Sequence, residues 1–297
     1  LTGPADCVAA GAAIAIAGFE PADPTGYGRL VPDEDGGINR IVEHKDATEK
    51  ERRIALCNGG IMAVRTPALF AWLSRITNDN AKGEYYLTDI VELAVADGQQ
   101  VRHVVIAEEE VMGVNDRLDL ARAEAALQSR LRIAAMESGV TMIAPKTVFL
   151  SADAVIERDV IIEPHVFIGA GCHIGEGSMI RSFSHLEGAR LGACCMIGPY
   201  ARLRPGTEAD EGVKICNFVE TKNTRLGAGA KANHLTYLGD AEIGSEANIG
   251  AGTITCNYDG YGKFQTLIGD RAFIGSNSAL VAPVSIGARA IIGAGST

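Results

Sequence analysis

The sequence predicts two fold classes in one chain, an α/β part followed by an all-β, left-handed parallel β-helix. Three observations predict it. An aliphatic residue recurs every six positions between Ile156 and Ile292, strand and helix patterns alternate in the first half, and one long helical pattern joins the halves. We expect the α/β part at 1–114, a linker helix at 115–140 and the β-helix at 141–297.

The six-residue period fits neither a helix nor an alternating strand, and it is typical of a parallel β-helix. Each hexapeptide makes one flat side and one corner, three make a coil, and the aliphatic side chains stack inside. We expect about eight coils, each rising by roughly 4.8 Å. The count slips by one before Leu191 and before Ile243. The aliphatic series is Ile156, Ile162, Ile168, Ile174, Ile180, Leu186, Leu191, Ile197, Leu203, Leu238, Ile243, Ile249, Ile268, Ile274, Leu280, Ile286 and Ile292.

Two kinds of small residue accompany this series. Glycine often follows the aliphatic directly, as in Ile168-Gly169, and we expect it there because the corner needs φ angles that a Cβ resists. The fourth residue after the aliphatic is small or β-branched, as in Val166 and Ser178, which leaves room inside the coil.

The first half alternates between strand and helix patterns, which predicts an α/β layer. The expected elements are strands at 12–19, 38–43, 58–64 and 101–107, a turn-rich loop at 23–29, helices at 66–76 and 84–97, and a long capped helix at 115–139.

Composition excludes several function classes. The net charge of −10 argues against nucleic acid or an anionic membrane as partner. No apolar run reaches the roughly 18 residues that span a bilayer, and no signal peptide is visible. The seven cysteines are scattered, which is typical of reduced thiols and predicts a cytoplasmic protein. The sequence ends inside the repeat without a cap, so we expect part of a longer chain.

Five motifs in the first half resemble a known family. They are Thr25-Gly26-Tyr27-Gly28-Arg29, Ile41-Val42-Glu43-His44-Lys45-Asp46-Ala47, Asn58-Gly59-Gly60-Ile61, Gly83-Glu84-Tyr85-Tyr86-Leu87-Thr88-Asp89 and Gly113-Val114-Asn115-Asp116-Arg117. They resemble the sugar-1-phosphate nucleotidyltransferases and, more narrowly, the bifunctional N-acetylglucosamine-1-phosphate uridylyltransferase/glucosamine-1-phosphate N-acetyltransferase family. The β-helix fits the same family, so the resemblance covers essentially the whole chain. It implies a partial, Rossmann-like nucleotidyltransferase domain and a role in UDP-N-acetylglucosamine and cell-wall synthesis.

The resemblance implies a UDP-sugar site in the first half. Gly28, Glu43 and Asn58 match positions that hold the UDP-sugar, and Asn115 matches a UDP-sugar-site residue that also binds Mg²⁺. The chemistry is reasonable, because glycine lets the backbone approach the sugar while Glu and Asn satisfy its hydroxyl and amide groups. Without the resemblance, Gly28 would be only a turn glycine and Glu43 a solvated strand end.

Polar residues interrupt the repeat between 198 and 263 and predict a second site. A sugar amine is mostly protonated near neutral pH, and a base must take its proton before it can attack a thioester. His234 lies in a polar run between aliphatic residues, so we expect it to face outward and to serve as that base. A lone histidine is more often structural, but the adjoining Asn, Tyr and Lys residues favour catalysis.

The same resemblance implies the ligands of this second site. Glucosamine-1-phosphate would be bound by Arg204, Lys222, Tyr237 and Asn248, with Lys263 nearby. Arg and Lys supply the cations that a phosphate needs. Acetyl-CoA would contact Ala251, Asn257, Tyr258, Ser276 and Ala294. The insertion between Ile249 and Ile268 is expected to project as a loop that reaches a neighbouring subunit of a homotrimer.

Three alternatives remain at this stage. A metal-dependent hydratase on the same fold would need His165, His173 and His185 to converge on zinc across subunits. A non-catalytic β-helix could serve only to trimerise a nucleotidyltransferase. An acyltransferase for another sugar or acyl donor is also compatible, because the sequence fixes neither the acyl length nor amine over hydroxyl.

We predict that these 297 residues do not transfer uridylyl groups. The family begins with a Gly-rich loop, a Pro-Lys pair that cradles the UTP phosphates and an Asp that shares the metal, and none of these lies within 1–297. Incubation with UTP, Mg²⁺ and N-acetylglucosamine-1-phosphate should release pyrophosphate no faster than the buffer control. Enzyme-dependent pyrophosphate release would refute this prediction.

Overall fold

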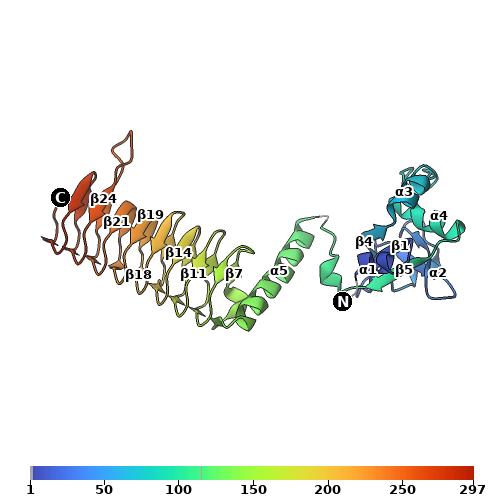
Figure 1. Ribbon diagram of the computed structural model, residues 1–297, viewed down its shortest axis with the longest axis horizontal. Helices are drawn as coiled ribbons and strands as arrows, with labels where there is room; N and C mark the ends of the chain where they lie inside the picture. Colours follow the sequence, from blue (N-terminus) through green and yellow to red (C-terminus); the bar gives the residue numbers. More distant parts are fainter. Residues whose placement is uncertain (1–2, 115) are drawn as a thin grey trace. The chain divides into compact units, whose positions relative to one another are not determined.

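A computed structural model describes residues 3–114 and 116–297 of the chain. Contacts divide the chain into two compact units, Leu1–Glu124 and Ala125–Thr297. Each unit is described by itself below (Figure 1). The division into 1–114, 115–140 and 141–297 remains a prediction.

The unit Leu1–Glu124 is an α/β layer built on a five-stranded sheet of order β3-β2-β4-β1-β5. Only β1 and β5 pair in parallel, and the other neighbours are antiparallel. The elements are α1 (Pro4–Ala9), β1 (Ile14–Phe19), β2 (Arg29–Pro32), β3 (Ile38–Val42), α2 (Glu49–Arg52), β4 (Cys57–Val64), α3 (Thr66–Leu73), η1 (Leu87–Asp89), α4 (Ile90–Ala96), β5 (Val101–Val105) and η2 (Glu108–Glu110). The sequence patterns missed β2, and they overextended the helix before α4 because the segment from Glu84 is a loop.

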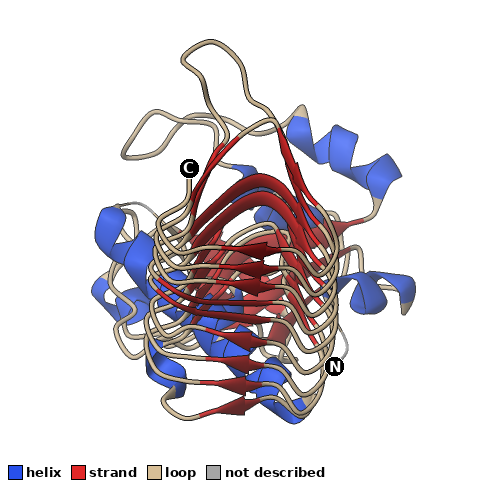
Figure 2. Ribbon diagram, turned by 90° about the vertical axis from the view of Figure 1, so that its left-hand side faces the viewer, coloured by secondary structure: helices blue, strands red, loops and turns tan. Residues whose placement is uncertain are grey.

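The unit Ala125–Thr297 is the predicted β-helix, with short parallel strands stacked in three faces (Figure 2). The first face holds β6 (Thr141–Met142), β9 (Ile161–Ile162), β12 (Met179–Ile180), β15 (Met196–Ile197), β18 (Lys214–Asn217), β20 (Lys231–His234), β22 (Asn248–Ile249), β25 (Phe273–Ile274) and β28 (Ile291–Ile292). The second face holds β7 (Phe149–Leu150), β10 (Phe167–Ile168), β13 (His185–Leu186), β16 (Arg202–Leu203), β23 (Ile254–Cys256) and β26 (Ala279–Val281). The third face holds β8 (Val155–Ile156), β11 (His173–Ile174), β14 (Ala189–Leu191), β17 (Thr207–Ala209), β24 (Thr266–Ile268) and β27 (Val284–Ile286).

Two long strands join the second and third faces. β19 (Glu220–Leu226) and β21 (Tyr237–Ile243) each pair with strands of both faces, so each turns the corner between them. Where the aliphatic count slips, as between Leu238 and Ile243, this corner is one residue shorter than the other corners. The slips in the sequence period therefore mark tight corners.

The aliphatic series forms the core of the β-helix, as predicted. Ile162, Ile174 and Leu203 are fully buried and belong to one continuous cluster. The repeat also continues through the segment that looked broken, because Thr221 takes an inward position and is fully buried. Its hydroxyl lies 2.9 Å from that of Thr207 on a neighbouring coil, which satisfies both polar groups inside the core.

The glycine after the aliphatic is needed for a different reason from the predicted one. Gly175 and most of its equivalents have φ angles outside the left-handed region, with Gly198 (φ 88°) as an exception. A Cβ at Gly175 would instead lie 2.5 Å from the carbonyl carbon of Gly192, so these glycines allow adjacent coils to approach closely. The left-handed angles occur two residues later, often at non-glycine residues such as Phe183 and Leu235.

Helix α5 (Arg117–Glu137) protects the first coil. The side-chain amide of Gln128 donates to the carbonyl oxygen of Leu150 at 2.7 Å and accepts from its N–H at 2.9 Å. Leu131 and Ala135 pack against the aliphatic core. The helix therefore satisfies backbone groups that would otherwise form an open sheet edge. Among the residues that the structure describes, no helix has both the length and the apolar character needed to cross a bilayer.

Two glycines without left-handed φ angles test the close-approach explanation. Gly175→Ala should lower the free energy of unfolding by about 1–3 kcal/mol, because the new methyl overlaps the backbone of the next coil. Gly262→Ala in the 258–263 segment should change it by less than about 0.5 kcal/mol, because the nearest atoms to its added Cβ lie 3.6 Å away, at an ordinary contact distance. Chemical denaturation of both variants measures the difference, and equal destabilisation would contradict the close-approach explanation.

Candidate active site

The corner between the first and second faces presents five residues in one column: Asn217, His234, Ala251, Ser276 and Ala294. The carbonyl oxygen of each of the first four accepts a hydrogen bond from the next coil. The donors are the N–H groups of Leu235 (3.1 Å), Gly252 (3.2 Å), Asn277 (2.7 Å) and Gly295 (2.8 Å). Three residues that we predicted to bind acetyl-CoA therefore share a line with the predicted base. We call this line the His234 column.

His234 ends β20, and its side chain is exposed, as predicted from the polar run around it. Its Nδ1 lies 2.8 Å from Oδ1 of Asn217, the residue paired with it on the preceding coil. An amide oxygen only accepts, so Nδ1 donates and Nε2 keeps its lone pair. The left-handed backbone of Leu235 (φ 50°) turns the chain directly afterwards. The arrangement leaves Nε2 available to take a proton.

Cations gather at the corner between the second and third faces. The ammonium groups of Lys222 and Lys263 lie within interaction distance, and the hydrogen bond and charge of Lys263 lower the pKa of Lys222. Arg204 adds positive charge nearby, although its Nη1 pairs with Oε1 of Glu220 at 2.9 Å. An anion held between the two ammonium groups would relieve their repulsion. The structure thus brings together three of the predicted phosphate ligands.

Tyr237 and Asn257 approach this corner above the backbone of Gly239. A Cβ at position 239 would overlap both the Tyr237 hydroxyl and the Asn257 amide nitrogen. Glycine at this position therefore leaves the space that these two side chains occupy. Asn257 is 7% exposed, so its amide is held in a largely enclosed setting.

The insertion after Asn257 forms a hairpin, as expected for an extra segment in a solenoid. The N–H of Phe264 donates to the carbonyl oxygen of Asn257 at 2.9 Å, and Tyr258 and Lys263 form an antiparallel bridge. The hairpin projects from the solenoid beside β24 (Figure 1). Tyr258 is 61% exposed and Lys263 is also exposed, so both are available to a ligand.

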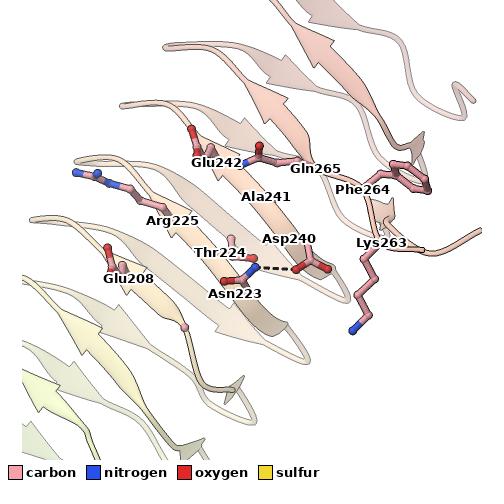
Figure 3. A pocket seen from close by; sticks show the side chains of 11 residues that line it. Glu208, Asn223, Thr224, Arg225, Asp240, Ala241, Glu242, Lys263, Phe264 and Gln265 are labelled. Atoms are coloured by element: carbon pink, nitrogen blue, oxygen red, sulfur yellow. Dashed lines mark hydrogen bonds between the residues drawn. The ribbon is translucent and has the colours of Figure 1, made fainter. Parts of the chain in front are cut away.

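A cavity of about 480 Å³ lies beside the same corner. Lys263 and Phe264 line it from the hairpin, and Asn223 and Asp240 line it from successive coils (Figure 3). We had assigned no role to Asn217, Asn223 or Asp240. Adjacent coils place these residues beside the proposed site, and the signal for this in the sequence is the change from six-residue to five-residue spacing.

Asn248 is the predicted sugar-phosphate ligand that lies apart from the others within one chain. It begins β22 on the first face, where it pairs with Lys231. Lys222, with Lys263 beside it, lies instead at the corner between the second and third faces.

In the unit Leu1–Glu124, the three predicted UDP-sugar residues come together. A Cβ at Gly28 would lie 3.4 Å from Oε1 of Glu43 and 3.6 Å from Cβ of Asn58. Burial raises the pKa of Glu43. The predicted metal ligand Asn115 lies outside the described residues. Within 3–114 and 116–297, no group of three or more His, Cys, Asp or Glu side chains is arranged to hold a metal.

The three histidines of the hydratase alternative lie on different parts of the coil. His165 stacks on Phe183 at a corner, and His185 stacks on Phe167 on the second face. His173 lies on the third face, 3.4 Å from Glu157.

Two solved structures that resemble this chain are distant matches. LpxA from Acinetobacter baumannii is 19% identical with a TM-score of 0.30, covering 47% of this chain and 66% of that one. The acetyltransferase domain of PglB from Neisseria gonorrhoeae, in complex with acetyl coenzyme A, is 16% identical with a TM-score of 0.27, covering 59% and 69%.

Sequence comparison gives much closer relatives. A family model described as bacterial transferase hexapeptide (six repeats) matches residues 153–188 and 265–297. The bifunctional protein GlmU of Azorhizobium caulinodans is 59% identical over 279 residues, covering 94% of this chain and 62% of the relative. The GlmU proteins of Sphingopyxis alaskensis and Acidiphilium cryptum are also 59% identical, covering 96% of this chain and 63% and 65% of theirs. The chain thus spans somewhat less than two thirds of these relatives, and it belongs to the GlmU family.

Proposed function

We propose that the β-helix catalyses the acetyl-CoA-dependent N-acetylation of glucosamine-1-phosphate. The observation that supports it best is the His234 column, in which an oriented imidazole lies in line with Ala251, Ser276 and Ala294. The lysine pair on the same coils supports a phosphorylated substrate. The name of the relatives, a bifunctional protein, agrees with one activity in each part of the chain.

In the proposed step, the amine of the sugar attacks the thioester carbonyl carbon of acetyl-CoA. The C–N bond forms, the C–S bond breaks, and the amine proton passes to Nε2 of His234. The sulfur leaves as thiolate and takes up a proton, which yields the amide and free CoA thiol. Asn217 keeps the imidazole in the tautomer that this step requires.

Charge and surface position suggest how the two ligands are held. Lys222, Lys263 and Arg204 would bind the sugar phosphate, with Tyr237 beside them and Asn248 contributed as described below. Acetyl-CoA would lie along the His234 column, with Asn257 and Tyr258 as further contacts. The repulsion between Lys222 and Lys263 supports this assignment, because a phosphate between them would stabilise both charged forms.

A homotrimer would complete this site. His234 and the lysine pair lie at different corners, and Asn248 lies on the first face, so a convex rod cannot surround one substrate with all of them. A second copy packed alongside would supply the missing side. The projecting hairpin offers Tyr258 and Lys263 to such a neighbour.

The second activity of the family, uridylyl transfer to N-acetylglucosamine-1-phosphate, is a proposal for the whole protein. Gly28, Glu43 and Asn58 would contact the UDP-sugar. Mg²⁺ would be bound through Asn115. A second candidate function for the β-helix is acetyl transfer to a different amino sugar phosphate. It is favoured because a lysine pair recognises the phosphate and not the rest of the sugar.

Removing the base should abolish most of the activity. His234→Ala should lower the rate of CoA thiol release with glucosamine-1-phosphate by about 10²–10⁴-fold, the usual contribution of a general base. Asn217→Ala should lower the same rate about tenfold, because the hydrogen bond that orients His234 is lost. His185→Ala is the matched control, since it is another exposed histidine of the β-helix.

The same assay separates the alternatives. A panel of sugar phosphates and acyl-CoA donors shows whether glucosamine-1-phosphate and acetyl are preferred. Wild-type rates equal to the buffer control would exclude acyl transfer and favour the scaffold interpretation. A His234→Ala rate within a few fold of wild type would show that the assigned base is wrong.

Activity should belong to a trimer. Light scattering of the active protein should give about three times the 31.2 kDa mass of one chain. Activity that persists in fractions containing only monomer would contradict a site shared between subunits.

A further inference from the structure

We propose that Asp240 is a positioning residue that fixes the side-chain amide of Asn257 and thereby anchors the hairpin for the use of acetyl-CoA. The inference deepens the proposed function and rests on it. Asp240 would touch neither substrate and would act through Asn257.

Asp240 lies in the middle of a three-residue ladder across successive coils. Its Oδ1 accepts from Nδ2 of Asn223 at 2.7 Å, and its Oδ2 accepts from Nδ2 of Asn257 at 2.5 Å (Figure 3 shows the Asn223 bond). Both Asn223 and Asp240 adopt left-handed backbone angles, 45° and 48°, at the tight corner. Each carboxylate oxygen therefore has its own amide donor, one on each side.

The ladder determines which atom of Asn257 faces away from Asp240. Because Nδ2 is engaged by the carboxylate, Oδ1 of Asn257 points elsewhere and remains available as an acceptor. Asn257 also closes the base of the hairpin through its carbonyl oxygen, which accepts from Phe264. Asp240 is thus the side-chain link between the tight corner and the segment that presents Tyr258 and Lys263.

Asp240 also places a negative charge among the cations. Burial raises its pKa, but hydrogen bonds from Asn223 and Asn257 and the charges of Lys263 and Lys222 outweigh burial, so its pKa lies below the usual value. Its carboxylate is therefore ionised near neutral pH. A negative charge at this position opposes the binding of a phosphate. The role of Asp240 is therefore better explained by its two hydrogen bonds than by its charge.

Two substitutions separate the hydrogen bond from the charge. Asp240→Asn and Asp240→Ala both remove the charge. In Asp240→Asn, the side-chain oxygen can still accept from Nδ2 of Asn257. The new NH₂ group then faces Asn223, which is exposed and can turn its amide over to accept from it. Ala offers nothing. Asp240→Ala should raise the KM for acetyl-CoA at least tenfold, and Asp240→Asn less than about threefold.

The KM for glucosamine-1-phosphate serves as the second readout. Both variants should leave it nearly unchanged, because the loss of a carboxylate near Lys222 and Lys263 offsets the looser anchoring of the hairpin that carries Lys263. A merely structural role would raise both KM values together. Asp153→Ala is the matched control, since Asp153 makes a comparable coil-to-coil contact, accepting from the N–H of Gly171 at 2.9 Å, near the start of the β-helix.

A double-mutant cycle with Asn257→Ala tests whether Asp240 acts through Asn257. Asp240→Ala should add less than about twofold to the KM for acetyl-CoA when Asn257 is already Ala. Far-UV circular dichroism and the thermal midpoint verify folding, and Asp240→Ser replaces Asp240→Ala if the latter does not fold.

The outcomes are distinguishable. No thiol release by the wild type would refute the proposed function itself. With an active wild type, three results overturn the positioning role: a KM for acetyl-CoA within twofold of wild type in Asp240→Ala, equal effects of the Ala and Asn variants, or full additivity with Asn257→Ala.

Discussion

Close stacking of one coil on the next is the constraint on which the rest of the structure depends. The aliphatic series supplies buried surface inside the coils, and the glycines that follow let adjacent backbones approach to a distance at which a Cβ at Gly175 would overlap Gly192. Once the coils are stacked, every corner position is repeated along the solenoid at a fixed spacing. Residues some 17 or 18 apart in sequence thereby become neighbours, as Asn217 and His234 do.

The inner and outer positions of the coil have separate tasks. Inward residues must be small or aliphatic, or must pair their hydroxyls as Thr207 and Thr221 do. Outward residues at the corners are free of that demand, so chemistry can be placed there without cost to the core. The His234 column and the Lys222–Lys263 pair occupy such outward positions on two corners. Beside the proposed site, the fold departs from its six-residue rule at the tight corners of Asn223 and Asp240 and at the hairpin after Asn257.

The sequence alone predicted the coil, its buried series and the outward direction of His234, because a strict period determines which side of a chain faces inward. It could not predict the partner of His234, since Asn217 becomes its neighbour only through the register between coils. The φ explanation for Gly175 was wrong, because close approach is a property of two coils and not of one. In the first unit, β2 was missed because its four residues, Arg29–Pro32, lack a visible alternation. Gly28, Glu43 and Asn58 were identified by resemblance, and their convergence required the sheet.

The most direct test is a crystal structure of this chain with CoA and glucosamine-1-phosphate bound. We expect the pantetheine arm along the His234 column, the sulfur beside Nε2 of His234, and the phosphate between the ammonium groups of Lys222 and Lys263, with a second subunit closing the site. CoA bound on another face, or His234 remote from both ligands, would contradict it.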